Sequence, residues 1–315
     1  MDKIIEKIRD AKSIAVLGHL NADPDAIGSC FSFAHMMRNM GKQATVYLSE
    51  PIEDRLRFMG SDYVVYDGKN AKKHDLCVCL DSGDIERLGS RRRIFDEADV
   101  TVSIDHHFTN TLFAQFNYVD SKSSAVGEIL CELFRRMGEK LDAEAAKQLY
   151  TAIASDTGSF KFSNVTPKTM REAANLLEYD FDHAEILRML YDSKTFDELR
   201  FSAEVIMRMK SCLGGKLTIV SIDKEMIERN GLEEEQVPNI VDIPRSVAGT
   251  EVAVSLREKD DTIRVNLRSN EYVDVAEIAL HFGGGGHKRA AGCNIDGKTL
   301  EEAEAAVVEL CSKLI

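Results

Sequence analysis

Short apolar runs alternate with helical patterns along the first third of the chain. The runs are rich in branched residues and apolar throughout, which is typical of parallel strands buried on both faces. They cover residues 13–18, 44–48, 76–80 and 100–104. Helical patterns separate them, and two of these, residues 26–40 and 124–137, are followed by a glycine that can end a helix. The alternation predicts an α/β domain with a mostly parallel sheet covered by helices on both faces.

The pattern changes after this first region. Residues 141–181 are mainly helical, and residues 184–209 form a charged helical stretch followed by Gly214-Gly215. We therefore predict a first domain over residues 1–183, a helical linker over 184–215 and a smaller α/β domain over 216–315. The last is expected to begin with a strand at 217–222, followed by a hairpin of 252–256 with 262–267. A short helix that ends at Phe282 should then begin with a capping box of Asp274 and Glu277.

Composition and charge limit the classes of function. A length of 315 residues fits two domains, and 44% hydrophobic with 30% charged residues is usual for a folded chain. The formal net charge is −13, so the molecule as a whole repels long nucleic acid. We expect no binding of long duplex nucleic acid, and a phosphate-bearing ligand would need a local positive site.

The chain is predicted to be cytoplasmic. No stretch approaches about 18 uninterrupted apolar residues, and the charged, amphipathic start has no apolar core of a signal peptide. The seven cysteines are scattered and odd in number, which favours reduced packing residues over a disulfide framework. Neither membrane association nor secretion is therefore expected.

Carboxylate and imidazole side chains follow the predicted strands and one predicted helix. Ligands of open α/β sheets bind beyond the carboxyl ends of the strands, so these side chains are expected to meet in one crevice. They are His19, Asp23, Asp25, Asp81, Asp105, His106, His107 and Asp156.

A crevice that collects four aspartates needs positive charge, because unpaired like charges raise one another's pKa and cost stability. Two divalent cations would balance them, with His19 and His106 as neutral ligands. Donors that are mainly oxygen favour manganese or magnesium over a structural zinc. The alternative is that each Asp is a turn former or helix cap, and it stays open for Asp84 and Asp105. The joint occurrence of the motifs favours the metal site.

These residues resemble a known family. Residues 19–29, Asp81, Asp105-His106-His107 and Asp156-Thr157-Gly158 are similar to the four motifs of DHH phosphoesterases. Residues 283–292, GGGGHKRAAG, resemble the GGGH motif of the DHHA1 domain. Length and layout are similar to short bacterial oligoribonucleases, or nanoRNases, that are also phosphatases on adenosine 3',5'-bisphosphate (pAp). One departure is Ala22, where the first motif usually has proline.

The resemblance implies a ligand set and roles. One ion would be held by His19, Asp23 and Asp81. The other would be held by Asp25, Asp81, His106 and Asp156, with Asp81 as the bridge. The metal would be manganese, with magnesium or cobalt as alternatives. His107 would face the phosphate, and Asp105 would orient a ligand histidine. A water shared by the two ions would attack phosphorus.

The second domain is expected to anchor the substrate. Glycines before His287 let the backbone approach a ligand, and nearby basic residues could grip a second phosphate. The predicted substrate-binding residues are Arg245, Arg268, Gly285, Gly286, His287 and Lys288. The alternative is a simple glycine turn beside a solvated hairpin face, which we favour for Arg264 and Arg289. A cleft between the domains would select short ligands, and the chain has no tryptophan for tracking a long strand.

The resemblance implies hydrolysis of short RNA to mononucleotides and of adenosine 3',5'-bisphosphate to AMP and phosphate, in a homodimer. Two other substrates would suit the same metal site, namely inorganic polyphosphate and linear dinucleotides such as pApA. A non-catalytic nucleotide-binding sensor is the alternative from another class. The intact set of ligand residues argues against a sensor.

Overall fold

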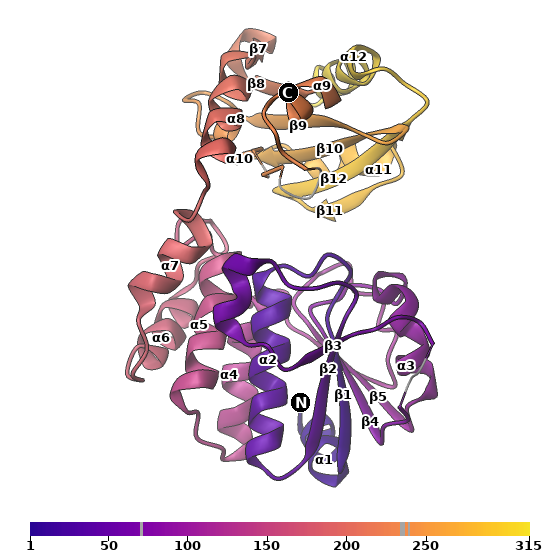
Figure 1. Ribbon diagram of the computed structural model, residues 1–315, viewed down its shortest axis with the longest axis vertical. Coiled ribbons are helices and arrows are strands. Elements are labelled where there is room, and N and C mark those ends of the chain that lie inside the picture. The colour runs from indigo at the N-terminus through magenta and orange to yellow at the C-terminus, as the bar shows by residue number, and fades with distance from the viewer. Residues whose placement is uncertain (70–71, 234–236, 239) are drawn as a thin grey trace. The chain divides into compact units, whose positions relative to one another are not determined.

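The computed structural model describes residues 1–69, 72–233, 237–238 and 240–315 and contains two compact units, Met1–Ser193 and Lys194–Ile315. Helix α7 (His183–Tyr191) belongs to the first unit, and α8 (Phe196–Met207) packs on β8 (Leu217–Ile222) of the second (Figure 1). The boundary thus falls inside the segment 184–215 that we expected to be a separate linker.

The first unit is built on six parallel strands in the order β3-β2-β1-β4-β5-β6. They are β1 (Ser13–Leu17), β2 (Gln43–Leu48), β3 (Tyr63–Val65), β4 (Leu76–Leu80), β5 (Val100–Asp105) and β6 (Phe116–Val119). The four predicted strands form the centre, whereas the edge strands β3 and β6 are short and less buried. The chain leaves β1 in one direction and returns to β4 on its other side. This reversal creates the crevice where open α/β sheets bind ligands.

Alternate residues of the strands serve two cores, one on each face of the sheet. Ile14 and Val16 join a cluster with α1 (Asp2–Asp10), α2 (Pro24–Asn39), α4 (Val126–Met137), α5 (Ala143–Asp156) and α6 (Pro167–Leu176). Ala15 and Leu17 join a second cluster with η2 (Glu86–Arg91) and α3 (Arg92–Glu97). Helices thus cover both faces, which confirms the predicted α/β class.

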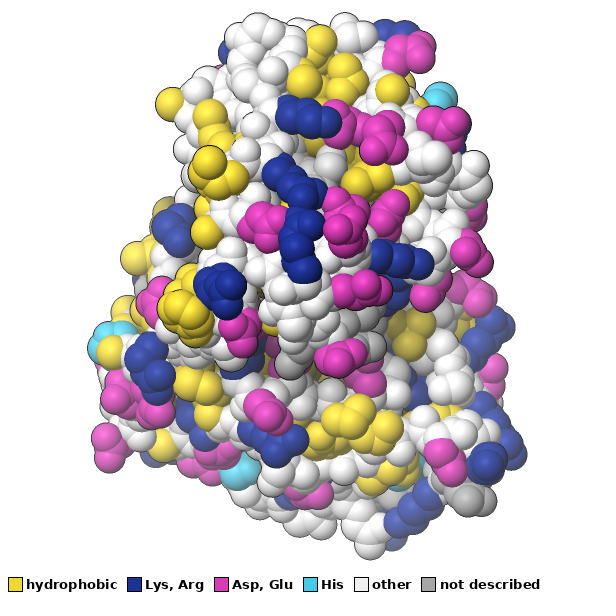
Figure 2. All heavy atoms as spheres, turned by 45° about the horizontal axis from the view of Figure 1, so that its top comes forward, with side chains coloured by type: hydrophobic (Ala, Val, Ile, Leu, Met, Phe, Trp, Pro, Cys, Tyr) yellow, Lys and Arg dark blue, Asp and Glu magenta, His cyan; other side chains and the backbone are white. Residues whose placement is uncertain are grey.

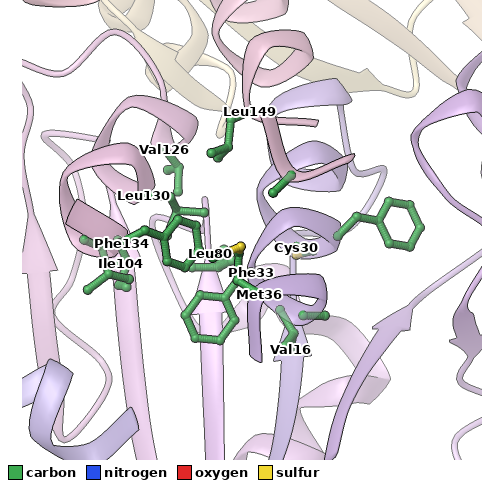
Figure 3. Packing of buried hydrophobic residues seen from close by; sticks show 14 of the residues in the cluster. Val16, Cys30, Phe33, Met36, Leu80, Ile104, Val126, Leu130, Phe134 and Leu149 are labelled. Atoms are coloured by element: carbon green, nitrogen blue, oxygen red, sulfur yellow. The ribbon is translucent and has the colours of Figure 1, made fainter. Parts of the chain in front are cut away.

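Close packing under α2 and α4 brings these helices onto the sheet. Phe33 of α2 and Phe134 of α4 lie with ring centroids 6.3 Å apart beside Leu80 of β4 (Figure 3). Both rings are buried, and burial of such a side chain contributes about 1.5–3 kcal/mol.

Two glycines let α2 and α4 approach α5 closely. A Cβ at Gly28 would lie 2.6 Å from the carbonyl oxygen of Gln148, and one at Gly127 would lie 2.7 Å from the Cβ of Ala152. Both distances are shorter than van der Waals contact. Because Asp25 and Asp156 lie on two of these helices, this packing also sets the distance between candidate site residues.

The second unit holds a sheet in the order β11-β12-β10-β9-β8-β7. Its further strands are β7 (Lys210–Cys212), β9 (Val252–Lys259), β10 (Thr262–Ser269), β11 (Gly285–His287) and β12 (Ala290–Asp296). Its further helices are α9 (Lys224–Arg229), α10 (Asp242–Arg245), α11 (Val275–His281) and α12 (Leu300–Cys311). Strands β9 and β10 form the predicted hairpin, and Asp274 caps α11. We did not predict β11 and β12, in which five of the ten residues are glycine or alanine.

The structure also shows how the charged side chains and the cysteines are distributed. On the face shown in Figure 2, basic side chains are interspersed with acidic ones. The seven cysteines are free, and all except Cys212 are buried. In the part of the chain that the structure describes, every helix is too short or too polar to span a membrane.

Substitution Gly127→Ala should lower the free energy of unfolding by about 1–3 kcal/mol, because the new methyl group overpacks the contact with α5. Ala152→Gly alone should cost about 1 kcal/mol through lost helix propensity. The double variant removes the opposing Cβ, so urea unfolding should show less destabilisation than the sum of the two single variants. Strict additivity would contradict the proposed contact.

Candidate metal centre

The predicted ligands lie around the point where the strand order reverses. His19 follows β1, Asp81 follows β4, and His106 follows β5. Asp23 is the N-cap of α2, and Asp25 lies in the first turn of that helix. Asp156 is the last residue of α5. Five separate elements thus supply the six predicted ligands, which are His19, Asp23, Asp25, Asp81, His106 and Asp156.

These six side chains form two groups with Asp81 between them. In the first group, His19 Nε2 lies 3.6 Å from Asp23 Oδ2 and 3.7 Å from Asp81 Oδ2. In the second, His106 Nε2 lies 3.5 Å from Asp81 Oδ1 and 3.3 Å from Asp156 Oδ2. Asp25 completes the second group, with a carboxylate oxygen within 4.8 Å of the facing atoms of His106 and Asp156. Each group has the donors and spacing to hold one cation.

The backbone of Asp81 is strained where it turns the carboxylate into the centre. Its φ of 57° is left-handed, which costs an L-residue with a side chain about 1–2 kcal/mol. Its amide donates to the carbonyl of Ile104 at 3.1 Å, so the sheet holds the turn in place. Such strain is typical of functional positions. Here it directs the two carboxylate oxygens towards different histidines.

Asp25 belongs to α2, and its carboxylate is fully buried against the N-terminus of α4. Its carboxylate accepts hydrogen bonds from the amides of Val126 at 2.8 Å and Gly127 at 3.1 Å, and from Ser29 Oγ at 3.0 Å. Burial, and then the charge of Asp81, nevertheless raise the pKa of Asp25 well above its ordinary value. Positive charge in the centre would favour the ionised form of Asp25.

The donor set fits divalent cations. Asp81 Oδ1 is buried and, among the described residues, has no hydrogen-bond partner. The His106 Nδ1–H can donate to the carbonyl of Ser123 at 3.3 Å, which leaves Nε2 facing the carboxylates. His19 Nδ1 lies 2.7 Å from the carbonyl of Leu20, with its Nε2 also facing carboxylates. Backbone carbonyls commonly orient metal-binding histidines in this way.

Asp105 is hydrogen-bonded to His107, which forms a further possible metal-binding group with Asp81 and His106, so that the role of Asp105 in orienting a ligand histidine stays a prediction. Asp105 Oδ1 accepts from His107 Nδ1 at 2.7 Å, and Oδ2 accepts from Asn110 Nδ2 at 2.7 Å. Burial favours the neutral acid, but the bond and charge of His107 outweigh it and lower the pKa of Asp105. His107 Nδ1 also lies 3.6 Å from Asp81 Oδ1. The Asp105–His107 pair therefore lies directly beside the two groups of predicted metal ligands.

Several supporting residues had no recognisable signal in the sequence. Glu128 is fully buried, and its Oε2 accepts from the amide and hydroxyl of Ser124 and from Thr169 Oγ1. It thereby fixes the segment that carries the Ser123 carbonyl and the amides bound to Asp25. A glutamate in a helical pattern is normally interpreted as exposed, and these contacts depend on the fold.

Arg87 and Asp84 lie on the neighbouring loop. Arg87 Nη2 lies 3.1 Å from His19 Nδ1, a contact that sequence reasoning missed. Asp84 Oδ1 accepts from the amide of Arg87 at 3.0 Å. Asp84 therefore makes a turn-forming contact, which is one of the two roles that we left open for it.

In the second unit, Arg268 and His287 share one face of the sheet. Arg268 of β10 is paired with Ala290 of β12, and Ala290 is paired with His287 of β11. Directly opposed residues of neighbouring strands point to the same face. Two strand spacings separate Arg268 from His287, about 10 Å. Burial lowers the pKa of Arg268, and Arg245 adds to this although Asp242 opposes it.

The remaining predicted substrate residues differ in their surroundings. Arg245 pairs with Asp242 at 3.1 Å, and Lys288 is exposed. Gly286 has a φ of 144°, and a Cβ there would lie 2.5 Å from the carbonyl oxygen of Ala290. Its glycine is thus required by the pairing of β11 with β12. Gly285 has open space at its Cβ position, which leaves room for a ligand.

Comparisons with known proteins match both units. The model of the DHH family, N-terminal domain, matches residues 13–153, and that of the DHHA1 domain matches residues 214–313. A Thermus thermophilus protein named bifunctional oligoribonuclease and PAP phosphatase NrnA is 30% identical over 94% of this chain and 88% of its own length. A Bacillus subtilis protein of the same name is 27% identical over 98% and 96%.

A solved structure shares the whole fold. It is the crystal structure of an exopolyphosphatase-related protein from Bacteroides fragilis, with a TM-score of 0.91 and 25% sequence identity. The match covers 98% of this chain and 95% of that one.

Substitution Asp81→Asn should abolish stabilisation by manganese while leaving the protein folded. At about 100 times the dissociation constant, a bound ion adds about 2.7 kcal/mol of stability. Mn²⁺ should therefore raise the Tm of the wild type and not that of the variant. Without metal, the variant should melt no lower than the wild type, because one buried charge is removed.

Asp84→Asn is the matched control, since an amide oxygen can still accept from Arg87. It should keep the Mn²⁺-dependent rise in Tm. The centre is contradicted if Asp81→Asn shows the same rise as the wild type in differential scanning calorimetry.

Proposed function

The chain belongs to the DHH family and carries a DHHA1 domain, as its motifs predicted, and we propose that it is a metal-dependent phosphoesterase acting on short RNA and adenosine 3',5'-bisphosphate. It would release mononucleotides from the first and phosphate from the second, leaving AMP. The observation that carries the proposal is the position of Asp81 between two groups of possible ligands, with one carboxylate oxygen near His19 and the other near His106. The names of the two curated relatives support the choice of substrates.

The ligand assignment follows the two groups. His19, Asp23 and Asp81 would hold one divalent ion, and Asp25, Asp81, His106 and Asp156 the other. We favour manganese, since the donors are carboxylate oxygens with one imidazole for each ion. Bound ions of this kind ready a water for attack at neutral pH and neutralise charge on the phosphate.

The residues around the ions would orient the substrate. Asp105 holds His107 through Nδ1 at 2.7 Å and so fixes the plane of the ring. His107 would donate a hydrogen bond to a nonbridging phosphate oxygen or to the leaving oxygen. Asn110 donates a hydrogen bond to the second carboxylate oxygen of Asp105 and so helps to hold Asp105 in the position in which it binds His107.

The second unit would anchor the rest of the substrate. Arg268 and His287 offer cationic or hydrogen-bonding groups on one face, with the small Ala290 between them. A guanidinium grips phosphate with two parallel hydrogen bonds, which suits the second phosphate of a bisphosphate or oligonucleotide. Arg245, Lys288 and the amides of Gly285 and Gly286 would contribute further contacts. The acidic surface disfavours long duplex nucleic acid.

A second candidate substrate is inorganic polyphosphate, which the name of the Bacteroides fragilis relative suggests. The same metal groups would serve it, and linear dinucleotides such as pApA would also fit the chemistry. Only the anchoring groups would distinguish these substrates. A homodimer in the cytoplasm remains part of the proposal.

A substrate panel tests the function. With Mn²⁺ at one fixed concentration, the wild type should release phosphate from adenosine 3',5'-bisphosphate and mononucleotides from short RNA faster than phosphate from polyphosphate. Asp81→Ala should abolish all turnover. Faster release from polyphosphate would favour the second candidate, and calorimetric nucleotide binding without release would favour a sensor.

Substitution Asp105→Asn should lower kcat by about 10–100-fold with little change in KM, because an amide can present its NH₂ to His107 Nδ1 and select the wrong tautomer. Asp75→Asn is the matched control, since Asp75 accepts backbone hydrogen bonds from Lys12 and Ser13 at the amino ends of β1 and β4, away from the candidate centre. It should leave both constants unchanged. A wild-type kcat in Asp105→Asn would remove the role of the pair.

A further inference from the structure

An exposed aromatic ring lies next to the candidate centre. Phe108 follows His107 directly, and 63% of its surface is exposed. Among the described residues of the first unit, it is the most exposed large apolar side chain and the only exposed aromatic one. A single exposed apolar side chain is common. Its meaning therefore depends on how the loop holds it.

The backbone presents Phe108 at the corner of a turn. The amide of Asn110 donates to the carbonyl of His107 at 3.1 Å, which closes a four-residue turn with Phe108 in the second position. Consecutive Cα atoms are about 3.8 Å apart. The Phe108 ring thus starts one residue from the imidazole that we assign to the substrate phosphate.

The loop is fixed to the rest of the centre. Asn110 Nδ2 donates to the carbonyl of Ser82 at 3.1 Å and to Asp105 Oδ2 at 2.7 Å. The amide of Thr111 donates to the carbonyl of Gly83 at 2.9 Å. These bonds join the loop to the segments that follow β4 and β5. The backbone that carries Phe108 is therefore tied to the centre by hydrogen bonds on its C-terminal side.

From this placement we infer that Phe108 is the surface on which a nucleobase of the substrate stacks when its phosphate lies at the metal centre. The inference rests on the proposed function and names a residue that would make the enzyme prefer substrates with a nucleobase. A base is joined to its phosphate through one ribose, so the two groups lie near each other as His107 and Phe108 do. Stacking tolerates any base, because every base has a π-face.

Stacking would also separate nucleotides from polyphosphate. Polyphosphate carries no ring, so it gains nothing from Phe108, whereas each nucleotide gains the stacking free energy. Phe108 would thus act in binding and not in bond cleavage. The expected effect of its removal is a rise in KM with little change in kcat.

The test compares Phe108→Ala with the wild type on an adenylate dinucleotide and on the same dinucleotide lacking the base at the nucleotide to be released. KM for the first should rise roughly tenfold, equivalent to about 1.4 kcal/mol. KM for the abasic substrate should not change. Phe108→Tyr, which keeps a ring, should behave as the wild type.

Leu112→Ala is the matched control, because Leu112 lies on the same loop and is 62% exposed but has no aromatic ring. It should leave KM unchanged, with the Tm of each variant measured to verify folding. An equal rise for the abasic substrate, or an unchanged KM in Phe108→Ala, overturns the stacking role alone. A wild type that hydrolyses neither dinucleotide overturns the proposed function as well.

Discussion

Repulsion between closely spaced carboxylates, of which Asp25 is fully buried, is the constraint on which the candidate metal centre depends. Burial, followed by neighbouring carboxylate charge, raises the pKa of both Asp25 and Asp156. The fold still brings the two carboxylates together: Asp25 of α2 contacts the N-terminus of α4, and Asp156 is the last residue of α5. Gly28 and Gly127 permit this, because they let α2 and α4 approach α5 so closely that a Cβ would not fit. The helix packing is thus also what assembles the cation site.

Most of this arrangement could be predicted from sequence, because a buried parallel strand is a continuous apolar run and its carboxyl end marks the ligand edge. His19, Asp81 and His106 follow such runs and do meet. The edge strands β3 and β6 lack such a run and were missed. The bond of Asp105 to His107 could not be predicted, since it depends on a local turn geometry that residue types alone do not specify. Glu128 reaches Thr169 across 41 residues of sequence, so no local pattern could reveal it.

The glycine motif of the second unit, residues 283–286, can be explained in two ways, by strand pairing or by ligand binding. The glycines before His287 suggested a backbone that approaches a ligand. Gly284 and Gly286 are instead required by β12, because a Cβ at either would meet that strand at 2.2–2.5 Å. The argument for a ligand therefore shifts to Gly285, which has space, and to the Arg268–Ala290–His287 row of the sheet. Ala290, one of the small residues that allow close strand pairing, also leaves little side-chain bulk between Arg268 and His287, the two groups able to bind phosphate.

The loop after β5 carries both His107 and Phe108, the two residues to which we assign phosphate binding and base stacking. Asn110 holds the carboxylate that orients His107, and the turn it closes presents Phe108. Hydrogen bonds from Asn110 and Thr111 tie this loop to the segments that follow β4 and β5. A base stacked on Phe108 would therefore lie in a defined position relative to a phosphate bound beside His107.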